Sequence, residues 1–105
     1  MPNRPESNGI SITHALEAHG WSNEETAAYE AAIEAVNGAV GAYSSLIAAE
    51  EAKPQPDRSL ITKAREAQTR LAREREALRS GDREQIAAAR RKYAQLAGEV
   101  RGGRA

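Results

Sequence analysis

The sequence of 105 residues contains no cysteine and no phenylalanine, and aromatic side chains make up only 4% of it. Without cysteine the chain has neither disulfide bonds nor thiolate metal ligands, a composition that is compatible with the reducing cytoplasm. A core without phenylalanine must be built from Leu, Ile, Val and Ala, which bury less apolar area per residue than aromatic side chains do. We therefore expect one small domain of modest stability that gains from association with a partner.

Long apolar stretches are absent as well. Residues 1–9, which include two prolines, lack the apolar region of a signal peptide and have the composition of a disordered segment. No other stretch is long and apolar enough to suggest a membrane span. The sequence therefore predicts a cytoplasmic protein that does not bind a membrane.

Residues suited to catalysis or metal binding are scarce. His14 and His19 are the only histidines, and their spacing of five residues does not place them on one helical face. No cysteine or aspartate lies near them to complete a metal site or a nucleophile–base pair. No glycine-rich loop follows a predicted strand, so the phosphate-binding motifs are missing. The sequence predicts a non-enzyme with no catalytic residue, metal site, cofactor or small-molecule substrate.

Helical periodicity is the clearest positive signal, and it is strongest between Ser22 and Ala52. Ser22 followed by Glu25 has the form of a capping box, which predicts a helix over 23–52. Large apolar residues then recur in steps of four and three, the spacing of heptad a and d positions. This large-residue row consists of Tyr29, Ile33, Val36, Val40, Tyr43 and Ile47.

A second row with the same spacing contains only small side chains. This small-residue row consists of Ala28, Ala31, Ala35, Gly38, Ala42, Ser45 and Ala49. An alanine-rich composition does not explain Gly38 and Gly41, because each glycine costs a helix interior about 1 kcal/mol relative to alanine. Small side chains let two helix backbones approach closely. Because a helix that is apolar or small on both sides is normally buried on both, we predict that this row binds another copy of the chain or a larger protein.

Two further helices are predicted after Lys53-Pro54-Gln55-Pro56, which cannot continue a helix. Asp57 caps the first, over 58–79, and Ser80-Gly81-Asp82 predicts a break before the second, over 83–100. One continuous rod through Gly81 is the alternative. The apolar row of the first is Leu60, Ala64, Ala67, Leu71 and Leu78, with Ile61 beside it, and that of the second is Ile86, Ala89, Tyr93, Leu96 and Val100.

These elements predict an all-α fold, either a three-helix antiparallel bundle or a helical hairpin with coiled-coil-like packing. A short N-terminal helix over 11–19 precedes it, and Trp21 pins that helix to the bundle. One helical domain then spans 10–101, and 102–105 form a flexible tail. The predicted core combines the large-residue row with Leu71, Leu78, Ile86, Tyr93 and Leu96.

The net charge of zero hides a division of the chain into an acidic and a basic half. Residues 1–56 carry a charge of −6, whereas residues 57–105, with thirteen basic and seven acidic groups, carry +6. We expect the two halves to face each other within the fold. A basic run at Arg90, Arg91 and Lys92 provides candidate phosphate contacts, although acidic residues are interleaved with the basic ones.

These observations favour a small helical interaction or oligomerisation module that acts as an adaptor, inhibitor or regulator. The predicted partner is a second copy of the chain or a larger protein. The alternative is an accessory protein that binds nucleic acid through the arginine-rich helices over 58–101.

Overall fold

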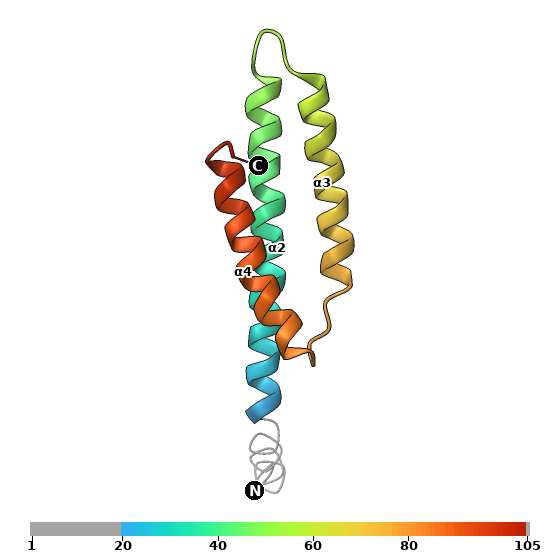
Figure 1. Ribbon diagram of the computed structural model, residues 1–105, viewed down its shortest axis with the longest axis vertical. Coiled ribbons are helices and arrows are strands. Elements are labelled where there is room, and N and C mark those ends of the chain that lie inside the picture. The colour runs from blue at the N-terminus through green and yellow to red at the C-terminus, as the bar shows by residue number, and fades with distance from the viewer. Residues whose placement is uncertain (1–19, 105) are drawn as a thin grey trace, which may run out of the picture.

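The computed structural model describes residues 20–104, with side chains from residue 23 onward. This part of the chain forms three helices, α2 (Gly20–Glu51), α3 (Arg58–Glu76) and α4 (Arg83–Arg101), and contains no strand (Figure 1). The prediction of an all-α helical bundle is confirmed. The predicted disordered segment 1–9, the short helix over 11–19 with both histidines, and the side chain of Trp21 lie outside the described residues.

Helix α3 runs antiparallel to α2 along the C-terminal half of α2. Near the connection between them, Arg65 forms an ion pair with Glu51 at 3.0 Å. At the other end of α3, the side chain of Arg75 donates a hydrogen bond to Asn37. Between these points Gln68 donates through Nε2 to the carbonyl oxygen of Val40 and to the hydroxyl of Ser44. Together these contacts fix the register of the α2–α3 hairpin.

Helix α4 runs in the same direction as α2 and covers its N-terminal half. Arg83, at the start of α4, lies 3.7 Å from the carboxylate of Glu25. Arg101, at the end of α4, donates to the carbonyl oxygen of Gly38 over 3.4 Å. The C-terminal end of α2 extends beyond the end of α4, as Figure 1 shows.

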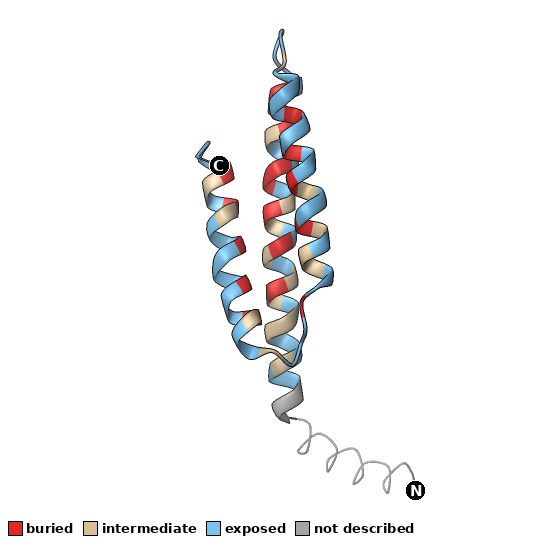
Figure 2. Cartoon of the chain, turned by 45° about the vertical axis from the view of Figure 1, so that its right-hand side comes forward, coloured by how far each residue is buried: buried red, intermediate tan, exposed pale blue. Residues whose placement is uncertain are grey.

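The three helices are arranged with α2 in the centre rather than around a shared axis. No Cα atom of α3 lies within 8 Å of a Cα atom of α4, whereas both helices contact α2 extensively. Figure 2 shows the buried residues of α3 and α4 on the sides of these helices that face α2. Helices α3 and α4 therefore pack on about one half of the surface of α2, and the other half of α2 faces outward.

The core is built largely from alanine. The buried apolar residues are Ala32, Val36, Ala39, Ala42, Tyr43, Ile47, Ile61, Ala64, Ala67, Leu71, Leu78, Ile86, Ala89, Tyr93, Ala97 and Val100. Ala32 and Ala39, which belong to neither predicted row, are fully buried because they lie between the two rows on the helix surface. The two rows thus flank one buried line, with α3 on the side of the large residues and α4 on the side of the small ones.

Several predicted boundaries differ from the structure. Helix α2 includes Gly20 and Trp21, so Ser22 lies inside it and the predicted start at residue 23 is wrong. A capping box stabilises a helix start by only about 1 kcal/mol, which does not stop a helix when the preceding residues can also take helical dihedrals. Glu25, the other member of the predicted box, instead pairs with Arg83.

Helix α3 ends at Glu76, before the predicted end at Arg79. Leu78 therefore belongs to the connection to α4, yet it is buried against the core as predicted. The predicted break between α3 and α4 is present, and Asp82 caps α4 by accepting a hydrogen bond from the backbone N–H of Gln85 at 3.0 Å. At the start of α3 the row is shifted, because Ile61 is buried whereas Leu60 is 37% exposed.

Residues 102–104 of the predicted tail form the end of α4, and Ala105 lies outside the described residues. Gly103 has a φ of +76°, in the left-handed region that favours glycine. Its backbone N–H donates to the carbonyl of Val100, and that of Arg104 donates to the carbonyl of Glu99 at 2.8 Å. This pair of bonds is the Schellman motif, so Gly103 terminates α4.

Candidate interaction face

The small-residue row lies partly beneath α4 and partly in the open. Ala42 is only 1% exposed, and Ala28, Ala31, Ala35 and Gly38 are half-buried along the stretch of α2 that α4 covers. Ser45 and Ala49 lie beyond the end of α4 and are exposed. Much of the close helix packing that this row predicts is therefore satisfied within the chain, by α4.

A face rotated slightly away from α4 is left uncovered along the length of α2. We call it the outer face, and it consists of Ala27, Ala31, Glu34, Gly38, Gly41, Ser45 and Ala48. These residues recur in steps of four and three, so they lie along one side of the helix. Five of the seven are exposed and two are half-buried. Apart from Glu34, every side chain on the outer face is Ala, Gly or Ser.

The two glycines of the outer face are not required by packing within the chain. A Cβ atom built on Gly38 or Gly41 would meet nothing within 4 Å. Both residues have helical neighbours on either side, where glycine costs about 1 kcal/mol relative to alanine. The one hydrogen bond at these residues, from Arg101 to the carbonyl oxygen of Gly38, does not require glycine, so the space at both Cβ positions is open to another molecule.

A groove between α2 and α4 borders the outer face on one side. We call it the α2–α4 groove, and it is lined by Ala31, Ala35, Ala87, Arg90, Arg91 and Ala94. Among the described residues, neither Arg90 nor Arg91 has a carboxylate within 4 Å. The groove thus has an alanine floor and a positively charged rim.

The opposite edge of the outer face is acidic. Glu30 and Glu34 line a hollow on the α3 side of α2, together with Tyr29, Ile33, Arg75 and Glu76. Neither Glu30 nor Glu34 forms an ion pair with a described residue. The outer face therefore separates a positive edge next to α4 from a negative edge next to α3.

The other polar clusters stabilise turns. Glu50, which is buried, accepts hydrogen bonds from Lys53 Nζ and from the backbone N–H of Asp57, both at 2.9 Å. These bonds, with that of Lys53 first, lower the pKa of the Glu50 carboxyl. Asp57 in turn caps α3 by accepting from the N–H of Leu60 at 3.1 Å. Glu50 thus ties the end of α2 to the start of α3.

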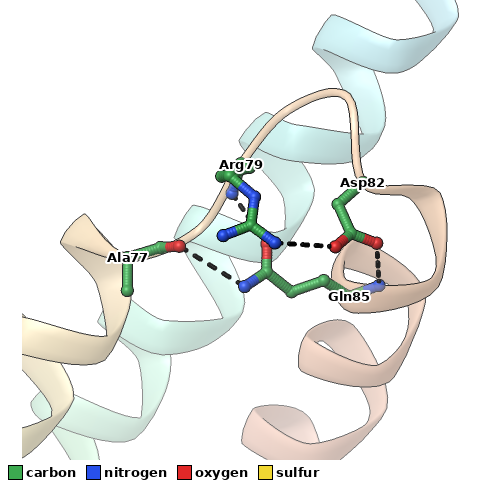
Figure 3. Close-up of polar contacts among 4 residues, drawn as sticks. All are labelled: Ala77, Arg79, Asp82 and Gln85. Carbon is green, nitrogen blue, oxygen red and sulfur yellow. Dashed lines mark hydrogen bonds and ion pairs between the residues drawn. The ribbon is translucent and has the colours of Figure 1, made fainter.

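The connection between α3 and α4 is held by four residues (Figure 3). Gln85 accepts from the backbone N–H of Arg79 at 2.8 Å and donates to the carbonyl of Ala77 at 3.3 Å. Arg79 also pairs with Asp82 at 3.1 Å. The pKa of Asp82 is lowered mainly by the N–H of Gln85, which stabilises the carboxylate at the start of α4. These contacts fix the connection between the end of α3 and the start of α4.

Tyr93 and Glu74 form the main link between α4 and α3. The Tyr93 hydroxyl donates a hydrogen bond to the Glu74 carboxylate, and Lys92 Nζ lies 3.9 Å from the same oxygen. Burial, followed by the bond to Glu74, raises the pKa of Tyr93 to about 12. Such a hydroxyl is a weak acid and stays protonated at neutral pH, which suits a structural role.

The predicted core and nucleic-acid residues fall into distinct places. Of the large-residue row, Val36, Tyr43 and Ile47 are buried. The remaining members, Tyr29, Ile33 and Val40, are half-buried and pack against the core, as does Leu96 of α4. Leu71, Leu78, Ile86 and Tyr93 are buried as predicted. Arg90, Arg91 and Lys92 are all exposed on α4, but Lys92 points to Glu74 and only the two arginines border the α2–α4 groove.

The described residues contain no cluster of three or more His, Asp or Glu side chains able to hold a metal ion. Within the same part of the chain, no helix has the length and apolarity needed to cross a bilayer. Comparison with protein families, curated proteins and solved structures found no match to this chain.

Proposed function

We propose that this protein is a non-enzymatic helical interaction module that presents the outer face of α2 to another protein. It would act by binding, as an adaptor, inhibitor or regulator, and the cytoplasm remains its predicted location. The polar clusters described above support this proposal, because each of them joins helices of the fold to one another.

The observation that carries the proposal is the pair of glycines at 38 and 41. They weaken the helix, and no contact within the described chain requires the absence of their Cβ atoms. Small residues at such positions are typical of helix pairs whose backbones approach closely and gain dispersion contacts along their length. A partner helix on the outer face would use this space.

A photo-activated cross-linking residue at position 41, introduced into the protein in its native cells, tests the proposal. The matched control carries the same residue at Thr62, which is exposed on α3. We expect position 41 to give cross-linked species of discrete mass, either with a second copy or with another protein, and position 62 to give none. The absence of cross-links at 41, or equal yields at both positions, would contradict the proposal.

A nucleic-acid-binding role is the second candidate, and one observation favours it. Arg90 and Arg91 are exposed and have no acidic partner among the described residues. Arginine side chains of this kind bind phosphate, and each phosphate contact adds to the dependence of affinity on salt. Replacing Arg90, Arg91 and Lys92 by glutamine should then abolish a steep salt dependence of DNA or RNA binding. Binding that is weak and insensitive to these changes would exclude this role.

A further inference from the structure

The two edges of the outer face carry opposite charges at the same height along α2. Arg83 pairs with Glu25 and Arg101 reaches Gly38, so α4 runs in parallel with this part of α2. Arg90 and Arg91, which lie between these ends, line the groove beside Ala31 and Ala35.

Glu30 and Glu34 occupy the same turns of α2 as Ala31 and Ala35. At about 100° per residue, however, Glu30 points to the opposite edge of the outer face and Glu34 to the middle of it. The hollow on the α3 side of α2 is lined by both glutamates, together with Arg75 and Glu76 of α3, and by neither Arg90 nor Arg91. The unpaired Glu30 is therefore level with the unpaired arginines and lies at the opposite edge of the outer face, and Glu34 lies on the face between them.

We propose that the partner of the outer face is a second copy of this chain, in a parallel two-fold dimer. In it, Glu30 and Glu34 of each α2 face Arg90 and Arg91 of the other chain's α4. This inference rests on the proposed function, because it assigns the occupant of the same face.

Symmetry decides the orientation of the two copies. When two α2 helices pack in parallel about an axis that runs along them, the α4 edge of each chain meets the α3 edge of the other. The basic rim of each groove then meets the acidic edge of the partner, in register and twice per dimer. When two α2 helices instead pack antiparallel, about an axis perpendicular to them, the α4 edge of each chain meets the α4 edge of the other, so arginine approaches arginine.

The heptad spacing of the outer face fits the parallel arrangement. Residues at a and d positions of a parallel pair meet their own copies across the axis, and flanking charges set the partner and the direction. Ala27, Gly41 and Ser45 would then meet the same residues of the second copy, which allows the two backbones to approach closely. Glu34, the one charged residue of this face, shares the heptad position of Ala27 and Gly41, so it would also meet its own copy; the arginines of the two α4 helices would neutralise this pair of like charges.

Charge reversal tests the proposed pairing. One variant carries Glu30→Lys and Glu34→Lys, and the other carries Arg90→Glu and Arg91→Glu; circular dichroism confirms that each remains helical. We expect the unmodified chain to dimerise in sedimentation equilibrium and each variant alone to dimerise at least about tenfold more weakly, because like charges then meet. An equimolar mixture of the two variants should restore the dimer, since every pair in the mixed dimer joins opposite charges. Reversed chains that dimerise as well as the original, or a mixture that stays monomeric, would overturn the proposal.

Single cysteines test the direction, because the natural chain has none. Ala27→Cys and Ser45→Cys, in separate variants, should each form a disulfide-linked dimer on mild oxidation, since two such distant positions both meet their own copies only in a parallel pair in register. Thr62→Cys, on the exposed side of α3, is the matched control and should not. A dimer that fails to cross-link at 27 or at 45 overturns the parallel arrangement. A chain that stays monomeric while position 41 cross-links to a different protein overturns the dimer but supports the proposed function.

Discussion

Replacing Gly41 by alanine should have opposite effects on folding and on association. Gly41 lies inside α2, and a Cβ atom there meets nothing within 4 Å. The added methyl group therefore brings no steric cost and removes the entropic cost of a helical glycine. We expect the free energy of unfolding of the single chain to rise by about 0.5–1 kcal/mol. For a domain of this size that corresponds to an increase in Tm of about 2–8 °C.

Urea denaturation measures this change at a dilution where sedimentation shows a monomer. The midpoint should move to higher urea while the slope stays unchanged, because the surface exposed on unfolding is the same. Gly81→Ala is the matched control. Gly81 also has open space around its Cβ position, but it lies in the connection between α3 and α4, so no helix-propensity gain is expected there.

The association constant supplies the second half of the test. If the backbone at Gly41 approaches a partner helix, the same methyl group must push the two helices apart and weaken binding. A variant that is more stable and associates as strongly as the original would show that Gly41 faces solvent. A variant that is less stable would show that something already occupies the space above Gly41.

Three further changes probe the fold itself. Leu71→Ala should lower the free energy of unfolding by about 2–5 kcal/mol, because this side chain is only 1% exposed, and calorimetry measures the loss. The original protein should lose stability at high pH, and Tyr93→Phe should abolish this loss. The raised Tyr93 pKa of about 12 contributes stability to the folded state that is fully present below the ordinary tyrosine pKa of about 10 and is lost as the pH rises toward 12. Stability curves of the two proteins that stay parallel between these pH values would contradict the assignment. Glu50→Gln should reduce the loss of folding stability in acid. The lowered pKa of the Glu50 carboxyl stabilises the folded state above about pH 4.3, and that contribution disappears as the pH falls through the lowered pKa. Urea titrations in acid that show no difference between the original protein and the Glu50→Gln variant would refute it.

Local patterns in the sequence were sufficient for most of the fold. Heptad spacing identified the three helices, and seven of the eleven core residues predicted from it are buried. Proline and aspartate marked the turn before α3, and Asp82 marked the start of α4. These signals succeed because caps and breaks are decided by a few neighbouring residues.

The arrangement of the helices could not be predicted in the same way. The two rows on α2 suggested opposed surfaces, one for the core and one for a partner. In the structure they flank a single buried line through Ala32 and Ala39, because α4 packs on the small residues. Which of two apolar faces a neighbouring helix chooses depends on contacts between distant parts of the chain, and the heptad pattern of one helix does not contain this information.

The outer face was also hidden in the sequence, because it shares Ala31, Gly38 and Ser45 with the predicted small-residue row. The outer face and the small-residue row differ by a rotation about the axis of α2 that is smaller than the roughly 100° between successive residues. Only the position of α4 shows that Ala42 is covered whereas Gly41 is open. The signal that sequence alone offers is the cost of the glycines, since composition explains the alanines but not residues that weaken the helix.

The division of charge between the two halves is only partly resolved within the chain. The acidic α2 does lie between the basic α3 and α4, but of the ion pairs in the described residues only Arg65–Glu51 and Arg83–Glu25 join the two halves. The charges left over are exposed, so their attraction across an interface is screened by salt over about 10 Å at 0.1 M. Raising the ionic strength should therefore slow association of the dimer much more than it speeds dissociation, because exposed charges steer encounter and the small residues hold the complex. Stopped-flow mixing of labelled chains measures both rates, and the mixed charge-reversed dimer is the control that should show the same dependence. Association rates that do not change with salt would show that the opposite charges of the two edges do not meet.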